Sequence, residues 1–440
     1  MATGAEEHLN LTAHPVGLLA LVVFAVAYLL VVVEETIHLR KSKPVLLAGG
    51  IIWALIGIVY SQSGRSQQAY DAAAHTIFEY GELFLFLLVA ITYVNTLEER
   101  RVFEALRTRL VSYKLGYRSL FWITGICAFC LSPLLDNLTT VLLMGAIVMT
   151  LGRDSPPFVA ISCTNLVVAA NAGGAFSPFG DITTLMVWQK GKAEFFEFFA
   201  LFVPSLINFA VPALFMHFAV PATEPESRGE KQIKMKPGAL SAVLLFAATI
   251  ATAVSFKNFL GLQPALGMML GLGYLQMLAY RLQIRGRKSD NGDVVLDSFE
   301  QIARVEWDTM LFFFGIIFAV GGLGVLGYLG LMSQFLYVDL GPTTANISIG
   351  ALSAVVDNIP MMFAVLTMDP QMSLGQWLLI TLTTGVGGSL LSIGSAAGVA
   401  LMGQARGVYT FSSHLKWSWA IALGYAASIV AHLYINAALF

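Results

Sequence analysis

The chain has 440 residues, of which 57% are hydrophobic and only 12% are charged, and its net charge is −2. Soluble domains carry about 25% charged residues, so this composition, with a mean hydropathy of +0.74, excludes an ordinary soluble globular protein. A net charge close to zero also supplies no basic field for a nucleic-acid partner.

Apolar stretches follow one another along the chain, several of them close to 20 residues long. The first two are residues 15–33 and 44–60, and later examples are 198–220, 237–256 and 310–332. About 20 apolar residues in a helix cross the hydrocarbon core of a bilayer. Counting each apolar run as one crossing predicts an all-α polytopic membrane protein with roughly 12 transmembrane segments.

Lys and Arg residues are concentrated in four segments, 40–43, 100–118, 228–236 and 281–288, whereas the loop 61–75 has Arg65 alone. Basic loops mark the cytoplasmic side of a membrane protein. The simplest threading therefore places these four segments inside and both termini on the periplasmic side. The polar stretch 281–306 is then a cytoplasmic linker between two halves of the chain.

A composite motif occurs once in each half. SPLLDN at 132–137 resembles SAVVDN at 353–358. Each copy is followed by a run of small residues with paired glycines, NAGG at 171–174 and GVGG at 385–388. Each run is followed in turn by a second polar break, SPFGD at 177–181 and LSIGS at 391–395. The preserved order predicts an internal repeat.

The two copies are expected to run in opposite directions. The helix before the first copy, about 78–96, ends in a basic segment, whereas its counterpart, about 307–332, begins after one. Inverted-topology repeats of this kind are typical of secondary transporters, whose substrate sites lie at mid-membrane where broken helices meet. We therefore divide the chain into N-terminal transmembrane helices outside the repeats (1–75), a first inverted repeat (76–220), connecting helices with the cytoplasmic linker (221–306) and a second inverted repeat (307–440).

Four carboxylates lie in or beside these apolar segments: Asp136, Asp181, Asp357 and Glu82. A central Asp costs about 3 kcal/mol on membrane-insertion scales, so such groups indicate a functional site or compensating interior contacts. The alternative interpretation is that the aspartates cap helices at the breaks, and that Glu82 lies near a membrane interface.

Neutral oxygen and amide groups surround the carboxylates, and the repeat segments contain no His. Hard cations are bound by oxygen ligands, and broken helices expose further carbonyls. An apolar environment favours the protonated carboxylate, which then releases its proton to an arriving Na⁺. Our hypothesis is that Asp136 and Asp357 form the main competing pair, with Asp181 nearby as a third ligand of the ion.

The segments 132–140, 171–188 and 356–361, with the run 387–398, resemble the NhaD-type sodium/proton antiporters of the ion transporter superfamily. The resemblance extends from about residue 82 to the C-terminus. It implies exchange of Na⁺ or Li⁺ for H⁺ without a cofactor, at alkaline pH or high salt. It also implies a re-entrant hairpin and an interrupted helix in each repeat, and a homodimer in the lipid bilayer of the bacterial inner membrane.

By position, the polar motif residues of that family fall on ten residues of this chain, and which Thr of the pair faces the site stays open. These residues are Glu82, Asp136, Asn137, Asn171, Asp181, Thr183, Thr184, Asn358, Ser392 and Ser395.

Other classes fit less well. A dicarboxylate carrier of the same superfamily uses Ser-Asn-Thr motifs at its hairpin tips, which Thr164-Asn165 and Thr383-Thr384 do not reproduce, and aspartates repel an anion. An arsenite carrier would suit a cysteine cluster, which the three cysteines do not form. An intramembrane aspartyl protease needs Gly-x-Gly-Asp, where this chain has PFGD at 178–181. A channel shares the oxygen ligands but needs no titratable group.

Overall fold

The computed structural model describes residues 9–37, 39–112, 115–224, 233–289 and 295–440, and the regular elements in these ranges are all helical. Nine helices of the described ranges are long and apolar enough to cross a membrane. The all-α polytopic class is therefore confirmed. Other apolar runs are divided into shorter helices such as Asn137–Leu151 and Asn358–Met368, because the chain breaks inside them.

The N-terminal helices pack on a helix from the second half. They are α1 (Pro15–Val32), α2 (Glu34–Ile37), α3 (Ser42–Gln62) and α4 (Ser66–Glu99). Helix α3 lies against α14 (Trp307–Val325), where Ile52 and Ile56 join Ala319 and Leu323 in one buried apolar cluster. Helix α4 has 34 residues without a break, so the domain boundary expected after residue 75 lies inside a continuous helix.

Two polar breaks, at 132–137 and 177–181, divide the next group of helices. This group is α5 (Val102–Ser112), α6 (Tyr117–Leu135), α7 (Asn137–Leu151), α8 (Pro156–Gly174), α9 (Ile182–Gln189), the 3-10 helix η1 (Phe195–Leu201) and α10 (Phe202–Ala219). Pro133 lies inside the last turn of α6. A proline there removes a backbone hydrogen bond and crowds the preceding turn, which suits a helix that ends at Leu135.

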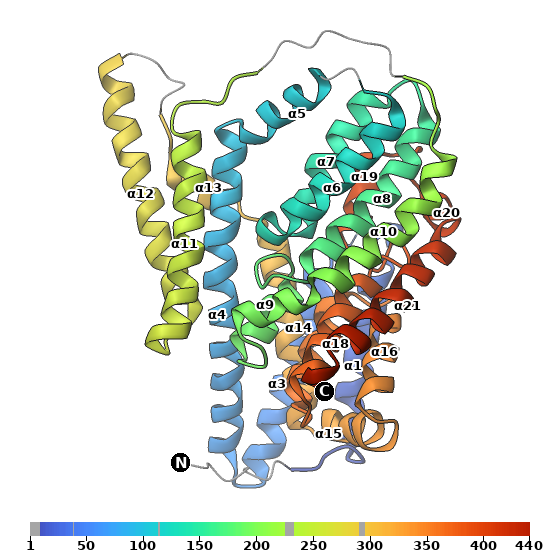
Figure 1. The fold of residues 1–440 in the computed structure, drawn as a ribbon. Helices are drawn as coiled ribbons and strands as arrows, with labels where there is room; N and C mark the ends of the chain where they lie inside the picture. The colour runs from blue at the N-terminus through green and yellow to red at the C-terminus, as the bar shows by residue number, and fades with distance from the viewer. Residues whose placement is uncertain (1–8, 38, 113–114, 225–232, 290–294) are drawn as a thin grey trace.

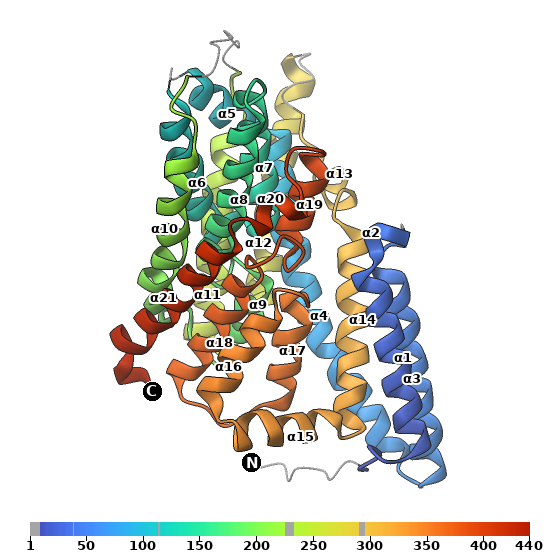
Figure 2. The same ribbon diagram turned by 90° about the vertical axis from the view of Figure 1, so that its right-hand side faces the viewer.

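The second half of the chain consists of α14 and the helices that follow it. They are α14, α15 (Tyr328–Ser333), η3 (Gln334–Asp339), α16 (Pro342–Leu352), α17 (Asn358–Met368), α18 (Leu374–Gly387), α19 (Ala396–Gln404), α20 (Phe411–Leu415), α21 (Ser418–Ile435) and η4 (Ala437–Leu439). In Figure 1 and Figure 2 the pair α6/α7 occupies the upper half of the bundle, and the pair α16/α17 occupies the lower half. Two hairpins that enter from opposite ends are what an inverted repeat requires, although the internal symmetry itself stays a prediction.

A separate hairpin, α11 (Ala239–Leu260) and α12 (Pro264–Ser289), packs on α4 beside the rest of the bundle (Figure 1). The short helix α13 (Ser298–Ala303) then leads into α14. Helix α5, the start of α11 and the end of α12 lie at the same end of the molecule, at the top of Figure 1. We call this the basic end, because α5 and the end of α12 are rich in Lys and Arg.

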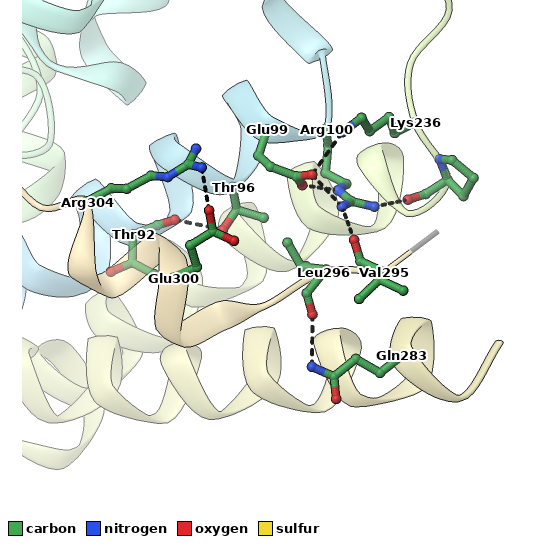
Figure 3. Close-up of polar contacts among 11 residues, drawn as sticks. Thr92, Thr96, Glu99, Arg100, Lys236, Gln283, Val295, Leu296, Glu300 and Arg304 are labelled. Atoms are coloured by element: carbon green, nitrogen blue, oxygen red, sulfur yellow. Dashed lines mark hydrogen bonds and ion pairs between the residues drawn. The ribbon is translucent and has the colours of Figure 1, made fainter. Parts of the chain in front are cut away.

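A buried arginine ties the basic end together (Figure 3). The side chain of Arg100, directly after α4, is fully buried, although the sequence suggested only a loop residue. Its guanidinium donates to the backbone oxygen of Pro237 at 3.2 Å and to that of Val295 at 2.5 Å. It also pairs with Glu99, which accepts a further hydrogen bond from Lys236 at 3.0 Å. One side chain therefore links α4 to the segments that precede α11 and α13.

The first prediction concerns this arginine. Arg100→Met should lower the stability by about 1–3 kcal/mol, because it leaves two buried carbonyl oxygens without their donor and leaves Glu99 with Lys236 as its remaining cationic partner. Arg304→Met is the matched control: Arg304 pairs with Glu300 at 2.5 Å, but both side chains are more than half exposed. The control should change the stability by about 0–1 kcal/mol. Thermal unfolding of the detergent-purified variants measures both effects, and equal shifts in the two variants would contradict the prediction.

Candidate functional site

Four helices of the described chain begin at the breaks, and each begins with a capping side chain. The first N–H groups of a helix have no partner inside the helix, so a side-chain oxygen before the first turn satisfies them. The caps are Asp136 for α7, Asp181 for α9, Asp357 for α17 and Ser395 for α19. The cap interpretation of the three aspartates is therefore confirmed, and it leaves open what else these carboxylates bind.

Asp181 lies where the two halves of the chain meet. Its Oδ2 accepts a hydrogen bond from the side-chain amide of Asn137 at 2.7 Å and another from that of Asn358 at 3.1 Å. Its Oδ1 accepts the backbone N–H of Thr183 at 3.0 Å, and the residue is only 7% exposed. Both asparagines of the repeated Asp-Asn motif therefore converge on one carboxylate.

The position of Asn137 is fixed by neighbours that only small residues allow. Ser132 donates its hydroxyl to Asn137 Oδ1 at 2.6 Å, which turns the amide nitrogen toward Asp181. A Cβ on Gly174 would lie 2.2 Å from Asn137 Oδ1, and a Cβ on Gly180 would lie 2.6 Å from the Gly174 Cα. Sequence reasoning did not place Ser132 in the site, although a serine stands at the same place in both copies of the motif.

The backbone of Asp136 is held in an unusual conformation, with φ +67° and ψ 163°. This region is populated almost only by glycine, and a non-glycine residue there costs on the order of 1–3 kcal/mol. The carboxylate accepts the Thr139 N–H at 2.8 Å and the Thr139 hydroxyl at 3.0 Å. Such local strain at the start of a capped half-helix is a feature of functional sites.

A cavity of about 490 Å³ brings together polar groups from both halves. Asn171 donates to the hydroxyl of Ser395 at 3.2 Å, which is a second side-chain contact between the halves. The cavity continues toward the basic end, where Glu98, Arg107 and Glu306 line it. The polar residues at or near the breaks that line it are Asp136, Asn137, Thr139, Asn171, Asp181, Asp357, Asn358 and Ser395.

Three predicted residues lie beside the cavity without lining it. The Thr184 hydroxyl donates to the backbone oxygens of Asp181, at 2.6 Å, and Ser177, at 2.8 Å, and so completes the helix cap. The hydroxyl oxygens of Thr183 and Ser392 are buried and make no hydrogen bond with the described residues. Of the two threonines, Thr183 therefore has the oxygen that remains available.

Glu82 lies apart from the three aspartates. It sits on α4 and does not line the cavity; the charged groups that act on it are Lys190, Glu79 and Lys257. These groups surround the C-terminal end of α9, whereas Asp181 caps the N-terminal end of that helix. The structure thus separates Glu82 from the group in which the sequence placed it.

In the described part of the chain, the aspartates do not form a metal site built of carboxylates alone. Among the described residues, no group of three or more His, Cys, Asp or Glu side chains could hold one metal ion. A cation in this cavity would therefore combine carboxylate with amide, hydroxyl and carbonyl oxygens, which are ligands typical of hard cations.

The fold and the site together define a multi-pass membrane transporter with its polar groups at broken helices. A family model described as "Citrate transporter" matches residues 12–385. The Na⁺/H⁺ antiporter NhaD of Vibrio cholerae is 54% identical over 99% of this chain and 95% of its own length. That of Alkalimonas amylolytica is 54% identical over 98% and 93%, and sodium/proton antiporter 1 of Arabidopsis thaliana is 31% identical over 99% and 75%. The chain belongs to the NhaD family of antiporters, which is a family of transporters and not of enzymes.

The second prediction tests the shared carboxylate. Asn137→Ala and Asn358→Ala each leave Asp181 Oδ2 with one side-chain amide donor, whereas the double variant leaves it with none. The loss of stability in the double variant should exceed the sum of the two single losses by about 1–3 kcal/mol, as contacting residues in one network do. Thermal unfolding of the four proteins gives this coupling. Asn436→Ala, which removes a bond to the Ala200 oxygen elsewhere, should combine additively with either variant.

Proposed function

We propose that this protein exchanges Na⁺ or Li⁺ for H⁺ across the bacterial inner membrane, and that Asp136, Asp181 and Asp357 bind either ion in turn. The observation that carries the proposal is the buried Asp181 carboxylate inside the cavity. It accepts one hydrogen bond from Asn137 of the first half and another from Asn358 of the second.

The charge of these carboxylates calls for a cation. The described hydrogen bonds to these carboxylates come from neutral groups: Thr139 for Asp136, the amides of Asn137, Asn358 and Thr183 for Asp181, and the Ile359 N–H for Asp357. A carboxylate buried in this way is costly unless a counter-charge compensates it, and a proton or a metal cation supplies that charge. Two ions that compete for one compensating position supply the coupling that exchange requires.

Neutral oxygens beside Asp181 suit an alkali ion. Asn171 Oδ1 and Thr183 Oγ1 are buried and lack hydrogen-bond partners in the described structure. Helices α6, α8, α16 and α18 end at the breaks, and the last carbonyls of a helix have no partner inside it. Na⁺ and Li⁺ are hard cations that take such oxygens in preference to nitrogen or sulfur. We therefore assign Asn171 and Asp181, which line the cavity, as candidate ligands of the transported ion, and Thr183 as a further oxygen beside it.

An anion carrier remains the second candidate, since the matching family model is described by citrate. A helix N-terminus binds anions through its free N–H groups. Here those N–H groups are already used by the side chains of Asp136, Asp181, Asp357 and Ser395. Three of these caps are carboxylates and would repel an anion, so the site favours a cation.

The orientation and assembly are part of the proposal. The Lys- and Arg-rich α5 and end of α12 lie at the basic end, which supports its assignment to the cytoplasm. The turn between α3 and α4 lies at the opposite end in Figure 1 and would then be periplasmic. We propose the same side for both termini, from the distribution of basic segments in the sequence. A homodimer is proposed on the family resemblance alone.

The third prediction concerns the aspartates. Asp136→Asn, Asp181→Asn and Asp357→Asn should each abolish Na⁺-dependent proton movement. An uncharged amide neither takes up a proton nor supplies the negative charge that attracts Na⁺. A pH-sensitive dye in proteoliposomes measures this, with Na⁺, Li⁺, K⁺, citrate and succinate added in turn. The exposed Asp71, far from the cavity on α4, supplies the control variant Asp71→Asn, which should keep full exchange. Wild-type-like exchange in all three site variants would overturn the assignment, and proton movement with citrate alone would favour the anion carrier.

The fourth prediction concerns pH. If H⁺ and Na⁺ compete for the same carboxylates, the half-saturating Na⁺ concentration should rise as the pH falls below the pKa of the site. The rise should be about tenfold per pH unit for each proton displaced, by linkage. The slope of this plot therefore counts protons per Na⁺. A half-saturating concentration that does not change with pH would exclude direct competition.

A further inference from the structure

A lysine from outside both predicted repeats contacts the end of α9 that lies away from the ion site. Lys257, in the last turn of α11, donates through Nζ to the backbone oxygen of Trp188 and lies 3.4 Å from that of Gln189. Its Nζ is also 5.5 Å from the centroid of the buried Trp188 ring. Trp188 and Gln189 are the last two residues of α9.

This contact adds a positive charge to the C-terminal end of α9, where the Trp188 oxygen also accepts the backbone N–H of Gly191. The last carbonyls of a helix have no partner inside it, and they form the negative end of the helix dipole. An ammonium at that end is therefore stabilising. Helix α9 has only 8 residues, and isolated helices shorter than about 12 residues are marginal, so its position depends on what holds its two ends.

The other end of α9 is the ion site, because Asp181 is its N-cap. At 1.5 Å per residue, the two ends lie only about 12 Å apart, so a shift at one end of so short a rod moves the other. A second contact acts at the same place as Lys257: Lys190, which follows α9, pairs with Glu79 of α4. Helices α4 and α11 thus hold the C-terminal end of the helix that carries Asp181.

We propose that Lys257 is a positioning residue for ion exchange, whose ammonium fixes the C-terminal end of α9 and thereby places Asp181 between Asn137 and Asn358. This inference rests on the exchange function proposed above. It gives the α11/α12 hairpin, which belongs to neither predicted repeat, a role in holding the site. The charged groups that face Lys257 are Glu82 and Glu194.

The test is the Na⁺ dependence of exchange by purified full-length variants in proteoliposomes at one pH. Lys257→Met keeps the apolar stem and loses the charge, and it should raise the half-saturating Na⁺ concentration about three- to tenfold, the range expected for a helix-end charge. Lys257→Arg keeps the charge and should stay within about twofold of the wild type. Lys236→Met, which removes an ammonium bonded to Glu99 at the basic end, is the control. It should lower the unfolding temperature without changing the half-saturating concentration.

The outcomes separate this inference from the proposed function. A wild-type protein that moves no protons on Na⁺ addition refutes the exchange itself. An active wild type, beside a folded Lys257→Met variant with an unchanged half-saturating concentration, overturns the role of Lys257 alone. If the Met variant does not fold, Lys257→Gln replaces it, and a wild-type value in that neutral variant is equally decisive. An Arg variant as impaired as the neutral one would also overturn the role of the charge.

Discussion

The arrangement of the site depends on one carboxylate that both halves of the chain share. Asp181 accepts hydrogen bonds from the side-chain amides of Asn137 and Asn358. Each asparagine directly follows the aspartate that caps its helix. The caps fix where α7 and α17 begin. Those starting points fix the positions of the Asn137 and Asn358 side-chain amides, and the two amides hold Asp181 at the start of α9. A buried carboxylate is tolerated only while such donors remain in place, so the breaks, the glycines and the hydrogen bonds form one cooperative unit.

Helix capping and ion binding are compatible roles for these aspartates. A bilayer requires every backbone group within it to find a partner, and helices that stop at mid-membrane leave N–H groups exposed at that depth. A carboxylate oxygen at each start satisfies them, as Asp357 Oδ1 does for the N–H of Ile359 at 3.4 Å. The same anionic group then attracts a proton or a metal cation. On the proposed mechanism, the carboxylates that cap these broken helices are the same groups that bind the transported ion.

The sequence predicted those parts of the site that have a local signal. Charge-poor runs gave the helical membrane class, and the repeated Asp-Asn and glycine motifs located the breaks that the structure brings around one cavity. Long-range neighbours had no such signal. Glu82 lies in an uninterrupted helix, so its apolar neighbours in sequence do not show its depth in the membrane or the groups around it. The structure places it near Lys257. Arg100 resembles any loop arginine in sequence, yet its buried contacts reach residues 137 and 195 positions away.

The two halves differ at one matching cap, and that difference bears on coupling. The first half starts its second half-helix with Asp181, whereas the second half starts its own with Ser395. Both caps take a side-chain bond across the halves, from Asn358 and from Asn171. On the proposed mechanism, an ion that neutralises Asp181 changes the strength of one cross-half bond and leaves the neutral Ser395 bond much as it was, because hydrogen bonds to an ionised acceptor are roughly twice as strong. Ion loading thus acts directly on a contact between the two halves, and the unequal caps supply a physical route from ion binding to reorientation.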